Sequence, residues 1–172
     1  MTDIDALRAL TTDAFGRVLE LVEGLSDLSP DQAVYRPDSQ ANSIAWLVWH
    51  AARVQDDHVA DLAGVEQAWP AWRDRFALPF DPWATGYGHS PDDVAAVRVG
   101  ADLLIGYYRD VHSLTVGYLN QLTADELDRV VDSNWDPPVT ASVRLVSVIG
   151  DTTQHLGQAY YVRGLAERAG IN

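Results

Sequence analysis

Apolar side chains recur every three or four residues along four long stretches of the chain, the spacing that gathers them on one face of an α-helix. The four stretches are residues 3–25, 43–63, 90–122 and 140–164. The last has the clearest stripe, which comprises Leu145, Val148, Thr152, His155, Ala159 and Val162. Nowhere do apolar and polar residues alternate strongly enough to predict a β-strand. The pattern therefore predicts an all-α bundle of four long helices, in a single domain that spans residues 1–172.

Residues with strong capping preferences mark the ends of these helices. Ser43 is a good N-cap for the second long helix, and Gly64 is its natural C-terminal stop. A serine followed by proline favours the first turn of a helix, and this pair begins at Ser29 and again at Ser90. We expect Ser29 to start a short helical turn and Ser90 to start the third long helix.

The connection between the second and third long helices has a different texture. Residues 65–91 contain several prolines and glycines around six large aromatic side chains. These are Trp69, Trp72, Phe76, Phe80, Trp83 and Tyr87. A connection of this length in a compact domain usually has a function. We expect it to form a lid or the wall of a pocket.

Composition then limits the classes of function. The net charge of −13 disfavours a nucleic-acid partner, because phosphate binding needs a basic surface. No apolar run approaches the length of a membrane span, and charged residues interrupt the N-terminal apolar positions, so we expect a cytoplasmic protein without a signal peptide. The chain has no cysteine, which excludes disulfides, thiolate metal sites and a cysteine nucleophile. Any thiol chemistry would need a thiol cosubstrate.

Asp151 and His155 are candidate metal ligands on the last helix. They lie four residues apart, so their side chains project from one helix face, one turn apart. On an inward face both need partners, since a buried polar group without one costs roughly 2–7 kcal/mol. A divalent metal ion would satisfy both. The alternative is a structural role, with Asp151 paired to an arginine such as Arg144 and His155 hydrogen-bonded to a neighbour.

A third ligand would come from the second long helix, where two histidines compete. His50 and His58 lie about 80° apart around the helix axis, so both can face the core. Spacing alone leaves this choice open.

Two motif helices carry a resemblance to a known family. They read SIAWLVWHAARVQDDH at residues 43–58 and GDTTQHLGQAYYVRG at residues 150–164. The pair resembles the DinB/YfiT-like superfamily, and within it the actinobacterial branch of mycothiol S-transferases and the N-terminal domain of mycothiol-dependent maleylpyruvate isomerases. The resemblance covers almost the whole chain. It implies an up-down four-helix bundle of the DinB/YfiT-like type, with a long aromatic-rich connection between helices two and three.

The resemblance also implies a metal site. Family members typically bind one divalent metal ion through a histidine of the second helix and two ligands four residues apart on the last. By position this assigns His50, Asp151 and His155 as ligands. Zinc is the metal we expect first, and nickel, iron or manganese would accept the same ligands. A homodimer is common in such bundles.

The function that we expect on these grounds is a metal-dependent S-transferase. Two histidines and one carboxylate around zinc leave the fourth position open. A metal-bound mycothiol thiolate would be transferred there to a small electrophile. Six further residues are candidates for contact with the thiol or the substrate: Arg53, Asp57, His58, Gln158, Arg163 and Trp83.

Three rival functions remain open at this level. The same bundle could bind a small ligand or a metal ion in a stress response without turnover, or it could be a purely structural homodimer. A thiol-dependent isomerase is the third; we expect it less than a transferase, because we expect no second domain of the kind that the isomerases carry. Motifs for di-iron carboxylate, phosphate-loop and HExxH chemistry are absent from the sequence.

Overall fold

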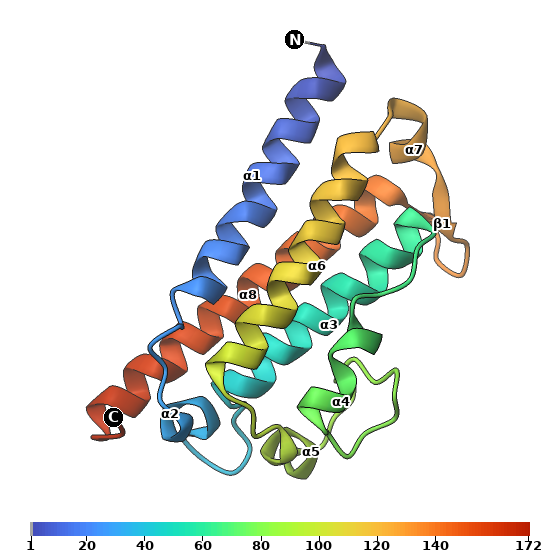
Figure 1. Cartoon of the computed structure of the whole chain (residues 1–172). Coiled ribbons are helices and arrows are strands. Elements are labelled where there is room, and N and C mark those ends of the chain that lie inside the picture. The colour runs from blue at the N-terminus through green and yellow to red at the C-terminus, as the bar shows by residue number, and fades with distance from the viewer. Residues whose placement is uncertain (1) are drawn as a thin grey trace.

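The computed structural model describes residues 2–172, and most of them are helical. Four long helices lie side by side (Figure 1). They are α1 (Asp3–Glu23), α3 (Ile44–Ala63), α6 (Ala101–Gln121) and α8 (Ala141–Arg168). The predicted all-α class is confirmed. Among the described residues, no helix is long and apolar enough to cross a membrane.

Shorter elements fill the connections between the long helices. They are α2 (Pro30–Val34), the 3₁₀-helix η1 (Trp69–Ala71), α4 (Arg73–Phe76), α5 (Pro91–Ala96), α7 (Ala124–Asp128), β1 (Val130–Asp132) and β2 (Val139–Thr140). The two strands pair antiparallel, so the expectation of no strand was wrong. Each strand is too short to show the alternation by which strands are recognised in a sequence.

The directions of the long helices differ from the alternating up-down order that we expected. Figure 1 shows α3 and α6 running in one direction and α1 and α8 running in the other. Arg8, near the start of α1, donates from Nε to the carbonyl oxygen of Leu122 just after α6, at 2.8 Å. Tyr160, late in α8, donates to the carbonyl oxygen of Leu21, late in α1, at 2.9 Å. A long connection allows this order, because residues 64–100 return the chain to the end at which α3 began.

The third long helix begins later than Ser90 predicts. Ser90 does cap a helix, but that helix is α5, which ends at Ala96. Val97 and Val99 are then buried in a non-helical segment, and α6 starts after Gly100. The sequence pattern therefore predicted one helix where the structure has two. The buried valines between them were counted as part of a helical stripe although their segment is not helical.

α3 is the central helix of the fold. Fifteen of its twenty residues are buried, because α6 and α8 pack along it and the connection from Gly64 to Gly100 lies over it (Figure 1). A helix that is buried on nearly all sides needs such cover. Its buried Gln55 is satisfied by α6, since it donates to Thr115 at 2.9 Å and accepts from Tyr108 at 2.5 Å.

The packing of α6 against its neighbours generates a stability prediction. Leu119 is fully buried in a cluster that contains Phe15 and Leu145. Leu119→Ala should lower the free energy of unfolding by about 2–5 kcal/mol, because it removes apolar contacts and leaves a cavity. Leu10→Ala is the matched control, since Leu10 is 69% exposed, and it should change that free energy by no more than about 0.5 kcal/mol. Urea denaturation followed by circular dichroism measures both. Equal effects would contradict this packing.

Candidate metal centre

The antiparallel packing of α3 against α8 brings three of the expected ligands together. His50 of α3 faces Asp151 and His155 of α8, and each offers one ligand atom within 4.8 Å of the other two. The ring centroids of His50 and His155 are 4.8 Å apart. His155 Nε2 lies 3.6 Å from Asp151 Oδ1. Two ligand atoms bound tetrahedrally to one zinc ion are about 3.4 Å apart, so small side-chain shifts would complete such a site.

The structure also shows which of the two histidines of α3, His50 or His58, lies in the cluster, a choice that helical spacing left open. His58 lies two turns from His50, near Arg144 of α8, whose Nη1 is 3.3 Å from the Nδ1 of His58. Burial, and then the Arg144 guanidinium, lower the pKa of His58. His50, and not His58, therefore lies beside Asp151 and His155.

The backbone and an aromatic ring fix the orientation of His50. Its Nδ1 lies 2.5 Å from the carbonyl oxygen of Thr85, and its ring stacks on Trp46 with centroids 4.7 Å apart. A carbonyl oxygen only accepts hydrogen bonds, so the proton of the neutral ring resides on Nδ1. The lone pair of Nε2 is then free to bind a metal ion. Burial lowers the pKa of His50, which favours this neutral form.

Two atoms of the cluster lack a hydrogen-bond partner in the described part of the chain, as the ligand atoms of a metal site would. Among the described residues, Oδ2 of Asp151 and Nδ1 of His155 are buried without a hydrogen-bond partner. Such atoms are rare in folded proteins, because each costs free energy unless something binds it. Two imidazoles and a carboxylate are ligands that zinc accepts. The side chain of Asp151 is 36% exposed, which leaves the cluster open on one side.

A pocket of about 380 Å³ opens in front of this cluster. His50, Val54, Asp57, His58, Thr85, Tyr87 and Asp151 line it. Asp57 and His58, which the sequence marked as candidates for thiol or substrate contact, thus share a pocket with two of the candidate ligands. Tyr87 is 94% exposed at its edge.

Arg53 has a different environment from the one expected of a residue that binds thiol or substrate. Its side chain is fully buried, and its guanidinium donates to Gln67 Oε1 at 2.9 Å and to Tyr107 Oη at 3.1 Å. The same group lies 3.5 Å from Asp56. Its donors are therefore directed at protein groups and not at a pocket.

The remaining three candidates lie outside the pocket in front of His50. Trp83 is 56% exposed, and Arg163 pairs with Asp27 and Glu167, at 2.9 and 3.0 Å. Gln158 lines a separate surface pocket with Leu47.

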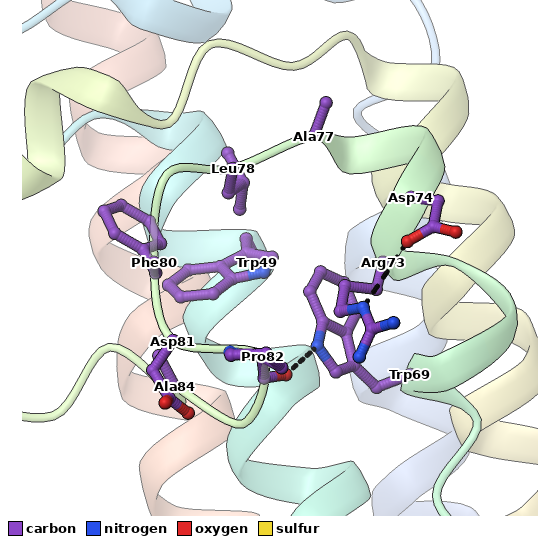
Figure 2. Close-up of a pocket in the computed structure, with 10 residues that line it drawn as sticks. All are labelled: Trp49, Trp69, Arg73, Asp74, Ala77, Leu78, Phe80, Asp81, Pro82 and Ala84. Atoms are coloured by element: carbon purple, nitrogen blue, oxygen red, sulfur yellow. Dashed lines mark hydrogen bonds and ion pairs between the residues drawn. The ribbon is translucent and has the colours of Figure 1, made fainter.

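The aromatic connection forms the wall of another pocket, as the sequence led us to expect of it. This pocket, also of about 380 Å³, is lined by residues that include Trp49, Trp69 and Phe80. Figure 2 shows Phe80 and Trp69 on opposite sides of it. Ala84 lines this pocket, whereas the next residue, Thr85, lines the pocket in front of His50. The two pockets therefore lie on either side of one short segment of the connection.

Sequence reasoning missed several residues around His50. Thr85 contributes only a carbonyl group, which has no signal in a sequence, and Trp46 reads as an ordinary core aromatic. His89, which the sequence analysis did not single out, accepts a hydrogen bond from Trp46 Nε1 at 3.2 Å. Its ring lies 4.4 Å from that of Phe80, centroid to centroid. A glycine within the aromatic connection, Gly86, was the one visible signal that the backbone approaches something closely.

Comparisons with known proteins identify the family to which the chain belongs. The family model described as mycothiol-S-transferase matches residues 6–167. A crystal structure of a conserved protein from Enterococcus faecalis is 35% identical in sequence and superposes with a TM-score of 0.84, covering 90% of this chain and 94% of that one. No curated protein sequence matches. Because the family model covers nearly the entire chain, this protein belongs to the mycothiol-S-transferase family, within the DinB/YfiT-like superfamily.

Proposed function

We propose that this protein is a metal-dependent transferase that uses mycothiol as its thiol substrate and joins it, through its sulfur, to a small electrophile. The observation that carries the proposal is the cluster of His50, Asp151 and His155, in which two buried atoms have no partner among the described residues. Membership of the mycothiol-S-transferase family supports the thiol. The proposal includes a single DinB-like domain, in which the four long helices form the bundle.

Three side chains would hold the metal ion. They are His50 through Nε2, Asp151 through its carboxylate and His155 through its imidazole, and zinc is the ion we propose first. When bound, the ion would supply a Lewis acid that lowers the pKa of a coordinated thiol. The open side of the cluster faces the pocket that Asp57 and His58 line, so the thiol would enter from there.

The protein's own groups would bind and orient the rest of the thiol molecule. Asp57, His58 and Tyr87 line the pocket and offer acceptors and donors for the hydroxyl groups of a sugar-like thiol. The chain has no cysteine, so the attacking sulfur has to come from the cosubstrate. The thiol would lose its proton to solvent, and its sulfur would form a bond to an electrophilic carbon, whose leaving group departs with the electrons of the bond that breaks.

Metal content is the first prediction. Protein made without a histidine tag should contain about one metal ion per chain by mass spectrometry, because the three ligands form one site. His50→Ala and His155→Ala should each lose it, whereas His58→Ala should retain it. Wild-type protein that stays metal-free after incubation with zinc or nickel would overturn the proposed site.

Thiol transfer is the second prediction. The metal-loaded protein should accelerate the conjugation of mycothiol to at least one member of a panel of electrophiles, such as monochlorobimane, with release of chloride. Removal of the metal by a chelator, or the change His155→Ala, should reduce the rate to that without protein, because the thiol is then not activated.

A matched variant tests the specificity of that result. His112→Ala alters a histidine of α6 that lies outside the cluster, and it should keep full activity. Metal-loaded protein that conjugates mycothiol to no electrophile in the panel would instead favour a binding protein without turnover.

A further inference from the structure

One segment of the connection is held through its backbone alone. The carbonyl oxygens of four consecutive residues, 82–85, each accept a hydrogen bond from a side-chain nitrogen. The donors are Trp69 Nε1 to Pro82 at 2.8 Å, Arg53 Nη2 to Trp83 at 3.4 Å, Arg53 Nε to Ala84 at 3.1 Å and His50 Nδ1 to Thr85 at 2.5 Å. Because carbonyl groups are the acceptors, these four hydrogen bonds do not use the segment's own side chains.

The arginine that donates twice is itself fixed. Arg53 is fully buried, lies 3.5 Å from Asp56 and places its guanidinium 4.9 Å above the ring of Trp69. Asp56 in turn accepts hydrogen bonds from the backbone nitrogens of Ala68 and Trp69, at 2.9 and 2.8 Å. A guanidinium presents its donors in a rigid planar fork. Carbonyls 83 and 84 are therefore held at a fixed place relative to α3, and Thr85 follows directly.

The residue after Thr85 is a glycine that lies against the His50 ring. Gly86 has φ +96°, and a Cβ atom there would lie 2.8 Å from His50 Nδ1 and 3.0 Å from Trp49 Cζ3. Real Cβ atoms do not come so close to another heavy atom, so a side chain at this position would have to displace the imidazole or the backbone. Glycine alone allows the chain to pass here with this positive φ and without that clash.

We propose that the peptide unit joining Thr85 and Gly86 is a positioning element for His50. The Thr85 carbonyl keeps the proton on Nδ1, and the bare backbone of Gly86 lets the segment pass close against the ring. Together they direct Nε2 toward Asp151 and His155. The inference rests on the proposed metal site. It means that Gly86 affects metal affinity through the orientation of His50, although Gly86 contributes no ligand atom. Groups that orient a ligating histidine typically change metal affinity by 10- to 100-fold when removed.

The same segment provides a matched pair of variants. Gly88 also has a positive φ, +76°, but, its two chain neighbours aside, no atom of the described residues lies within 4 Å of the point that a Cβ atom would occupy there. Gly86→Ala and Gly88→Ala therefore both introduce backbone strain in the same segment, and only Gly86→Ala pushes on His50.

Zinc affinity of the full-length protein, measured by competition with a chromophoric chelator, is the first readout. Gly86→Ala should weaken zinc binding by about 10- to 100-fold relative to Gly88→Ala. Thermal unfolding of both metal-free variants separates this effect from a general loss of stability. Equal zinc affinities in the two variants would overturn the inference.

The second readout needs no metal. Long-range ¹H–¹⁵N spectra of the imidazole nitrogens, with His50 assigned through His50→Gln, report which nitrogen carries the proton. Metal-free wild type and Gly88→Ala should show the proton on Nδ1, and Gly86→Ala should lose that preference. A wild-type His50 with its proton on Nε2 would overturn the inference. If wild type binds no zinc, the proposed function fails, and the spectra still decide whether this peptide unit orients His50.

Discussion

The buried guanidinium of Arg53 is the constraint on which the rest of the structure depends. A charge without access to water is tolerated only when it is fully paired and hydrogen-bonded. Here Asp56, Gln67, Tyr107 and two backbone carbonyls surround it. α3 alone supplies only Asp56, so the connection has to fold over α3 to satisfy the arginine. Removing one member of such a buried pair typically costs about 3–5 kcal/mol, because the other charge is left without a partner.

The burial of Arg53 also affects the candidate metal centre, because Arg53 and His50 lie about one helix turn apart. His50 and Arg53 are three residues apart on α3 and so face the same side. The backbone segment that satisfies Arg53 therefore continues to the carbonyl that binds His50. The backbone of α8 places Asp151 and His155 one turn apart on the same face. The centre thus combines two residues spaced by one helix with a histidine whose orientation comes from the connection.

The sequence predicted the helices and the three clustered residues well, because both depend on side-chain spacing. Four apolar stripes indicated the long helices, the four-residue step joined Asp151 to His155, and the family resemblance selected His50 over His58. The features that the sequence did not predict depend on backbone groups or on packing between distant parts of the chain. The parallel course of α3 and α6 depends on where the connection ends, and the role of the Thr85 carbonyl is independent of its side chain. Arg53 was misjudged because an arginine in a sequence suggests exposure, whereas here the connection buries it.

The charges of the cluster are consistent with the proposed thiol as a ligand of a bound metal ion. As metal ligands, the two imidazoles would be neutral and the carboxylate would carry −1, so a divalent ion would bring the centre to a formal charge of +1. The chain as a whole carries −13 and repels anions at long range. An incoming thiolate would neutralise the remaining positive charge inside a largely buried site, where an unpaired charge is costly. A cluster of three carboxylates would leave no such positive charge. Two histidines and one carboxylate would therefore suit a metal ion such as zinc, which also accepts a sulfur ligand, better than a hard ion that prefers oxygen ligands.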